Sequence, residues 1–179
     1  TNYCINTANP FNWVHVAKKI NKLSPDLVVF QWWHPYFAPC YQIICSLLKT
    51  KEILFVCHNV FPHERFPMDR LLTQATLKKG KYYIVHSKLD EVDLLSVKKD
   101  ARYKKAVIPT YNVFNKSQLE KDDARKILNV AQNEFVLLFF GLIREYKGLK
   151  HLLKALSIIK NEIPNVKLYI VGDFGGEKD

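Results

Sequence analysis

The chain has 179 residues, of which 48% are hydrophobic and 13% aromatic, and it carries a formal net charge of +10 at pH 7. This composition provides enough apolar side chains for a packed core and excludes an intrinsically disordered chain. The length suits one large domain or one domain with part of another, and most of the positive charge falls in residues 1–111, which are therefore expected to attract anions.

The cysteines argue against a disulfide framework and against a zinc site. They are Cys4, Cys40, Cys45 and Cys57. None forms a Cys-x-x-Cys pair and most lie in apolar runs, as is typical of small buried side chains in a reducing compartment. Residues 27–48 contain no charged side chain, but Gln, His and Pro interrupt them, which favours buried elements over a membrane span. Because the chain begins at Thr1, we expect its true start to be missing.

Residues 1–111 alternate helical patterns with short apolar runs. We expect helices over 10–23, 36–48, 69–79 and 87–97, and strands over 27–30, 52–57, 82–85 and 106–108. Residues 32–35 are expected to form a loop after the first strand, and Ser87 to cap the last of these helices. Alternation at this spacing predicts βαβ units and a parallel sheet.

Residues 112–123 lack apolar periodicity and are predicted to be a linker. A short helix is expected over 122–130, then a strand over 135–140, a helix over 148–161 and a strand over 166–171. Two strands and one long helix are too few to bury a parallel sheet. We therefore expect residues 124–179 to be the beginning of a second α/β domain that is incomplete.

Polar side chains follow three of the expected strands of the first domain. The clusters are Trp33-His34-Pro35, His58-Asn59 and His86-Ser87. Because the carboxyl ends of parallel strands share one edge, we expect these clusters to converge on one cleft. A single histidine is more often structural than catalytic, and loops of this kind tolerate polar residues, so the pattern alone leaves both interpretations open.

A second candidate site follows the apolar run 135–140, which reads as a strand buried on both faces. Gly141 ends the run, a turn presents Arg144 and Lys147, and Gly148 leads into a helical pattern. A helix N-terminus with two cations favours an anion, and Arg offers a fork to phosphate oxygens. The turn therefore predicts a phosphate or diphosphate site, with ordinary solvated charges as the alternative.

The run Gly141-Leu-Ile-Arg144-Glu-Tyr-Lys147-Gly148, followed by an apolar helix, resembles the donor-binding motif of retaining GT-B glycosyltransferases of family 4, the glycosyl transferases group 1. His58-Asn59-Val60 with Pro62-His63-Glu64 is similar to a loop of the same family. The run from Trp32 to Pro39, Val85-His86-Ser87 and Ile108-Pro109-x-Tyr111 also fit it. Together these stretches span roughly residues 25–172 in the family's order.

The resemblance implies a GT-B fold of two Rossmann-like domains. Residues 1–111 would form the acceptor-side domain and residues 124–179 the start of the nucleotide-sugar-binding domain. The implied reaction moves a sugar from a nucleotide diphosphate sugar to a hydroxyl of a saccharide or lipid-linked acceptor, with retention and with no metal or other cofactor, in polysaccharide or glycolipid assembly.

The resemblance also assigns residues to roles. Arg144 and Lys147, with Gly141 and Gly148, would hold the diphosphate as it leaves. His58 would position the donor sugar. His34 and Glu64 would line the acceptor side, although Glu64 could instead pair with Arg65 or Arg70 at the surface.

Two family features are absent from the sequence, the Gly-rich loop of the first domain and the Glu-x7-Glu pair of the second. We therefore expect the 179 residues alone to be inactive. The alternatives are a non-catalytic GT-B-like fragment or subunit, and another α/β nucleotide-binding protein, although the latter would need a Gly-x-Gly-x-x-Gly turn that the sequence lacks.

The protein is expected to be cytoplasmic. The basic residues between 78 and 105 predict that it makes weak contact with an anionic membrane surface, at the inner face of the membrane. Lys-rich solvated faces are also common without such a role. Nucleic acid is not an expected partner, because no helix-turn-helix, zinc finger or aromatic RNA-binding motif is present.

Overall fold

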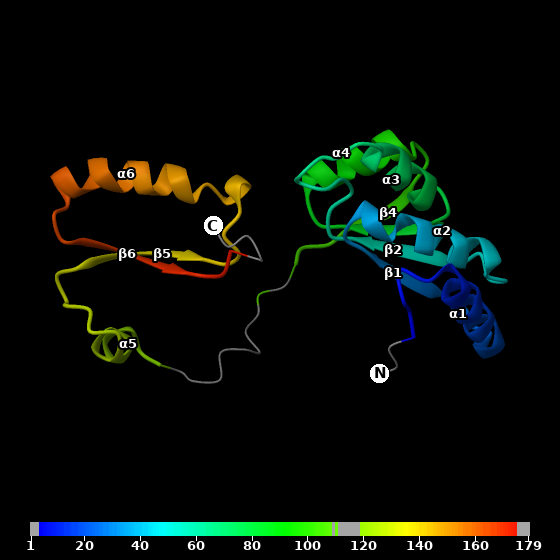
Figure 1. Cartoon of the computed structure of the whole chain (residues 1–179), viewed down its shortest axis with the longest axis horizontal. Coiled ribbons are helices and arrows are strands. Elements are labelled where there is room, and N and C mark those ends of the chain that lie inside the picture. Colours follow the sequence, from blue (N-terminus) through cyan, green and yellow to red (C-terminus); the bar gives the residue numbers. More distant parts are fainter. Residues whose placement is uncertain (1–3, 109, 111–118, 175–179) are drawn as a thin grey trace. The chain divides into compact units, whose positions relative to one another are not determined.

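A computed structural model describes residues 4–108, 110 and 119–174. The chain divides into two compact units, Thr1–Thr110 and Tyr111–Asp179, here called the first and the second unit (Figure 1). Each unit contains a parallel sheet with helices, so the predicted α/β class is confirmed. Among the described residues, no helix is long and apolar enough to cross a membrane.

The first unit is a four-stranded parallel sheet in the order β1-β2-β3-β4. Its elements in chain order are α1 (Pro10–Leu23), β1 (Val28–Trp32), the 3₁₀ helix η1 (Pro35–Phe37), α2 (Ala38–Leu47), β2 (Ile53–Cys57), α3 (Asp69–Leu77), β3 (Tyr82–Val85), α4 (Lys88–Val97) and β4 (Arg102–Lys105). Helices α2, α3 and α4 lie along one face of the sheet (Figure 1). The core forms on this face.

Local chemistry sets the limits of α1. The side chain of Asn9 accepts hydrogen bonds from two N–H groups of the first turn, and Ser24 ends the helix in the left-handed region at φ 45°. Asn21 then ties α1 to the end of α2, because its amide donates to the Leu47 carbonyl at 2.8 Å and accepts from the Lys49 N–H at 2.8 Å. Trp13 is buried in the shared core.

Aromatic side chains fill the centre of the first unit. Phe30, Trp32, Phe55 and Tyr83 come from three neighbouring strands, and each is at most 6% exposed. The Trp32 indole donates to the Val60 carbonyl at 3.1 Å, which satisfies its buried N–H. Alternate residues of the strands point to the opposite face, where the side chains of β2 and β3 are half-buried and two of β1 are exposed.

The structure corrects two boundaries of the first unit. Trp32 was expected in a loop but belongs to β1. The last strand was expected over 106–108 but lies at Arg102–Lys105, in register with β3 so that Val85 faces Lys105. Among the described strands β4 pairs with one neighbour, and a strand at a sheet edge can carry Lys and Arg where an inner strand needs apolar side chains. The apolar run at 106–108 misled the prediction, and Val107 is 88% exposed.

The second unit comprises α5 (Lys121–Ile127), β5 (Phe135–Phe140), the 3₁₀ helix η3 (Glu145–Lys147), α6 (Leu149–Glu162) and β6 (Val166–Val171). Strands β5 and β6 pair in parallel with Phe135 opposite Val166 and Phe140 opposite Val171. Helix α6 lies along one side of these strands and α5 on the other (Figure 1). The predicted elements are therefore present.

The prediction that β5 is buried on both faces is wrong for this structure. Leu138 is 63% exposed and Phe140 is 79% exposed. The physical reason is that β5 pairs only with β6 among the described strands, and none of the seven residues of α5 is buried. The predicted linker 112–123 overlaps the start of α5, and its residues 112–118 lie outside the described part of the chain, as do Pro109 and Tyr111.

Candidate functional site

Two glycines close the carboxyl ends of β5 and β6. The Gly141 N–H donates to the Val171 carbonyl at 2.9 Å, and Gly141 has φ 122°, which side chains rarely allow. A Cβ on Gly172 would lie 1.8 Å from the Gly141 carbonyl oxygen. Gly172 therefore lets the two strand ends meet. Sequence reasoning assigned no role to Gly172, although a glycine directly follows each of the two strands.

The turn after Gly141 presents the two predicted cations. The Ile143 N–H donates to the Asp173 carbonyl at 2.8 Å, and Arg144 follows with extended backbone before η3. The N–H of Lys147 closes η3 on the Arg144 carbonyl at 3.0 Å. Arg144 is half-buried and Lys147 is exposed. Both therefore lie between a strand and a helix, as predicted.

Gly148 joins this turn to α6 with φ 75°, a left-handed conformation that favours glycine. It is the N-cap of a helix of 14 residues, and it offers no side-chain acceptor to the first N–H groups. No acidic residue lies in the first turn of α6. The helix N-terminus thus keeps its positive end for an anion. The arrangement can hold a phosphate, with Arg144 and Lys147 supplying charge.

In the first unit, a pocket of about 510 Å³ lies where β2 and β3 end. Its lining includes His58 and Asn59 after β2, and His86 and Ser87 after β3. The predicted convergence is confirmed for these two clusters, whereas the third predicted cluster, Trp33-His34-Pro35, does not line this pocket. Arg65 and Ile108 contribute from other loops.

His58 is fixed on three sides. Its Nε2 lies 2.8 Å from the Gln31 amide oxygen, and its ring centroid lies 4.6 Å from that of Trp33 and 5.6 Å from that of His86. Burial lowers the pKa of His58, and the neighbouring His86 lowers this pKa further. His58 therefore favours the neutral form near pH 7.

Residues at the beginning of α4 line the pocket. Ser87 caps the helix by accepting from the Asp90 N–H at 3.0 Å, and its hydroxyl donates to the Asp90 carboxylate at 2.5 Å. The same carboxylate accepts from the Val60 N–H at 3.0 Å. One turn later, burial raises the pKa of Asp93, and the nearby charge of Asp90 adds to this rise. The predicted cap at Ser87 is thus confirmed.

The remaining two predicted residues lie apart from this pocket. His34 caps η1, with its Nδ1 accepting from the Tyr36 N–H at 3.1 Å, and its ring stacks on Phe66 at a centroid distance of 5.3 Å. Glu64 is exposed, and its possible partner Arg65 pairs with Asp69 at 2.5 Å. Within the described residues, neither His34 nor Glu64 lines the pocket. Their acceptor-side role stays a prediction.

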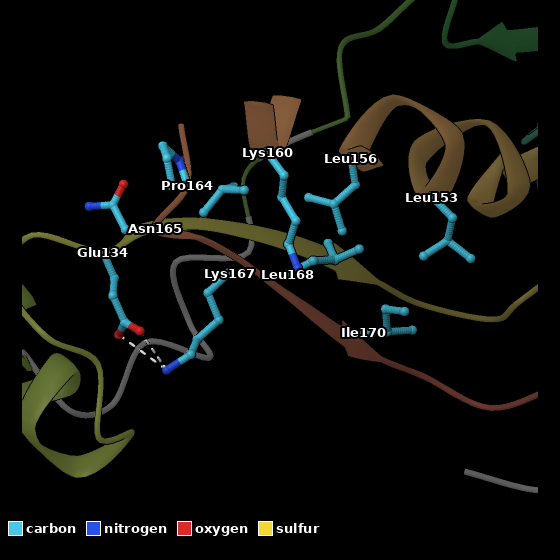
Figure 2. A pocket seen from close by; sticks show the side chains of 10 residues that line it. Glu134, Leu153, Leu156, Lys160, Pro164, Asn165, Lys167, Leu168 and Ile170 are labelled. Carbon is cyan, nitrogen blue, oxygen red and sulfur yellow. Dashed lines mark hydrogen bonds and ion pairs between the residues drawn. The ribbon is translucent and has the colours of Figure 1, made fainter. Parts of the chain in front are cut away.

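A second hollow, of about 470 Å³, lies between α6 and β6 (Figure 2). Leu153 and Leu156 face the strand from the helix, and at one end Lys167 pairs with Glu134 at 2.9 Å. Its lining contains no residue of the 141–148 turn. This hollow is a gap along an apolar helix face, and two of its charged side chains, Glu134 and Lys167, are paired with each other.

Part of the second unit is similar to a known protein family. Residues 120–179 match the family described as glycosyl transferases group 1. Arg144, Lys147 and the flanking glycines all lie within the matched residues, which makes the resemblance of the turn to a donor-binding motif part of a family match.

Three proteins of known sequence or structure are similar to the chain. An uncharacterized glycosyltransferase of Methanocaldococcus jannaschii is 27% identical over 175 residues, covering 88% of this chain and 42% of the relative. Anabaena HepE, solved in complex with UDP and glucose, is similar with a TM-score of 0.70 at 19% identity, over 92% of this chain and 44% of HepE. The apo structure of OtsA is similar with a TM-score of 0.62 at 13% identity, over 90% and 43%. The chain thus has a GT-B-type fold and spans less than half the length of these relatives.

Proposed function

We propose that the protein is a glycosyltransferase that moves a sugar from a nucleotide diphosphate sugar to an acceptor hydroxyl, with retention, in polysaccharide or glycolipid assembly. The observation that carries the proposal is the turn between β5 and α6, where Arg144 and Lys147 lie inside the residues matched to glycosyl transferases group 1. The complex of HepE with UDP and glucose supports a nucleotide-sugar ligand.

The chemistry follows from where charge develops. As the sugar leaves, negative charge grows on the diphosphate, and donors placed in advance stabilise that charge more than they stabilise the bound substrate. Arg144 supplies a planar fork and Lys147 a mobile point charge. The N-terminus of α6 adds N–H groups and its dipole. The proposal includes no metal ion or other cofactor, and transfer that requires a divalent cation would contradict that part.

In this proposal His58 positions the donor sugar. The imidazole is held against Gln31 and Trp33, and its lowered pKa favours a neutral ring at the pH of the cytoplasm. A neutral imidazole can accept a hydrogen bond from a hydroxyl group at one ring nitrogen and donate one from the other, without adding charge to the pocket.

Arg144→Ala and Lys147→Ala in the full-length protein test the proposal. Each should lower kcat/KM about 10²–10³-fold, because each removes one donor to the developing charge. Each should also weaken binding of UDP, GDP or ADP, measured by thermal shift. Lys154→Ala is the matched control, since Lys154 is an exposed lysine of the same helix, away from the turn.

Three results would separate the alternatives. Wild-type transfer in both variants would contradict the diphosphate role. Binding of nucleoside diphosphates without any turnover would favour a non-catalytic subunit. A full-length protein that neither binds nucleoside diphosphates nor transfers a sugar would contradict the proposed function.

Contact with an anionic membrane surface stays a prediction. Several of the basic side chains that suggested it are engaged within the protein: Lys81 pairs with Glu52, Lys88 and Lys105 pair with Glu91, and the Lys98 ammonium donates to the Gly80 carbonyl. Sedimentation with anionic vesicles that does not fall as salt rises would contradict it.

A further inference from the structure

His86 lies in the pocket beside His58 and has no part in the reaction described above. It follows β3 and is half-buried, and its Nδ1 lies 2.8 Å from the Ala106 carbonyl oxygen. A carbonyl oxygen only accepts, so Nδ1 carries the hydrogen. In the neutral ring Nε2 then keeps a lone pair. The backbone beyond β4 thus fixes which nitrogen of His86 can accept a hydrogen bond.

His58 has the opposite arrangement. Its Nε2 donates to the Gln31 amide oxygen at 2.8 Å, which leaves the lone pair on Nδ1. The two ring centroids are 5.6 Å apart. Each imidazole therefore uses its one N–H on the protein and keeps one acceptor. Two neighbouring acceptors match a ligand with neighbouring hydroxyl groups.

The other charged groups of the pocket indicate that this ligand is neutral. Asp90 and Asp93 both line it, and their charges disfavour a phosphate or carboxylate. Arg65 also lines it, but Asp69 holds the Arg65 guanidinium with two hydrogen bonds, at 2.5 Å and 2.9 Å, and matches its charge. A volume of about 510 Å³ lies within the usual range for small-molecule sites.

We propose that His86 contacts the ligand through Nε2 and that, with His58, it accepts hydroxyl hydrogens from a neutral saccharide in this pocket. This inference rests on the proposed function, because the saccharide is either the transferred sugar or the acceptor. It adds a specificity-determining residue to which sequence reasoning had assigned no role of its own.

A pair of substitutions in the full-length protein separates the two nitrogens of His86. His86→Asn keeps an amide N–H near the position of Nδ1, for the Ala106 carbonyl, and removes the acceptor at Nε2. His86→Gln places an amide near Nε2 and loses the contact with Ala106. His15→Asn is the control, since His15 is exposed on α1. Thermal unfolding of each variant verifies that it is folded.

Binding is measured with two probe sets, which distinguish the two sources of the saccharide. Methyl glycosides of glucose, galactose and mannose, observed by saturation-transfer NMR, report an acceptor sugar. Nucleotide sugars compared with their nucleoside diphosphates report the transferred sugar. His86→Asn should weaken binding about tenfold in one of these sets, as expected for one lost hydrogen bond. His86→Gln should bind within about threefold of the wild type.

The affinity for nucleoside diphosphates should stay unchanged in both variants, so failure of this inference is distinct from failure of the Arg144 and Lys147 proposal. Wild-type saccharide binding by His86→Asn would overturn the inference. Equal losses in the Asn and Gln variants would also overturn it, because the contact with Ala106 would then be the cause. So would a wild-type protein that binds no methyl glycoside and binds nucleotide sugars no better than nucleoside diphosphates.

Discussion

The two units hold their candidate groups by different means. In the first unit, hydrogen bonds of the rings themselves orient the imidazoles, from His58 to the Gln31 side chain and from His86 to the Ala106 backbone carbonyl. In the second unit, backbone geometry shapes the turn, through Gly141 at φ 122° and Gly148 at φ 75°. An imidazole acts through one chosen nitrogen and needs a partner for the other, whereas an anion can be held by N–H groups and charge that the backbone presents.

The two units also differ in how much support lies beneath these groups. Behind His58 and His86 is a continuous core that includes the fully buried Phe55. Behind Arg144 is the strand β5, whose apolar side chains are largely exposed in this structure. Substitutions at matching strand positions should therefore have very different effects in the two units.

The largest expected effect is that of Phe55→Ala. Phe55 is 0% exposed and stacks on Phe30 at a centroid distance of 5.3 Å, so its removal should cost about 3–5 kcal/mol of unfolding free energy. Phe140→Ala removes the same side chain from a strand of the second unit, where it is 79% exposed, and should cost under about 1 kcal/mol in the 179-residue chain.

Denaturation followed by tryptophan fluorescence measures the first substitution, because Trp13, Trp32 and Trp33 all lie in the first unit. Hydrogen exchange of β5 and β6 measures the second. Equal losses from both substitutions would break the comparison, since they would show that Phe140 is covered in solution.

Gly172→Ala should have the next largest effect. The added Cβ would meet the Gly141 carbonyl oxygen at 1.8 Å. The oxygen belongs to the backbone and the position of a Cβ is fixed by its own backbone, so the strand ends must separate. A loss of about 3 kcal/mol is expected from such overpacking, together with loss of nucleoside diphosphate binding. Gly148→Ala is the matched control, because a Cβ there meets nothing closer than 3.8 Å and only the positive φ costs about 1–2 kcal/mol. A larger loss of thermal stability in Gly148→Ala than in Gly172→Ala would contradict this account of the turn.

The same contrast explains which features the sequence could predict. Apolar periodicity located β2, β3, β5 and β6, because their register places apolar side chains at regular positions. It missed β4, whose Lys and Arg side chains are allowed at an edge. The motif around Arg144 was visible because a family resemblance rests on local residues. The locking of His86 by Ala106, twenty residues away, depends on where β4 ends and so could not be read from the sequence.

The positions of the histidines after the predicted strands also could not show which of His34, His58 and His86 would lie outside the pocket. His34 follows β1 as His58 follows β2, yet the chain after His34 turns at once into η1, which needs an N-terminal cap. The Nδ1 of His34 serves as this cap by accepting the Tyr36 N–H, and the His34 ring stacks on Phe66. Sequence position therefore predicted the common edge of the sheet but not the local demand of a helix start.

The smallest expected effect is a pH dependence that belongs to the first unit. The pKa of His58 is lowered in the folded protein from the ordinary value of 6.5, by burial first and then by His86. Between that value and the lowered one the unfolded chain binds more protons, so stability rises with pH and the rise ends above about pH 6.5. His58→Gln should flatten this slope in denaturation curves recorded between pH 5 and pH 8. Hydrogen bonds from Tyr103, Lys88 and Lys105 lower the pKa of Glu91 to about 2. Glu91 therefore changes the stability mainly below its ordinary pKa of 4.5 and does not contribute to the slope between pH 5 and pH 8. An unchanged slope in the variant would show that the imidazole is not desolvated, and the side-chain contacts that set the first unit apart would then lack their effect on His58.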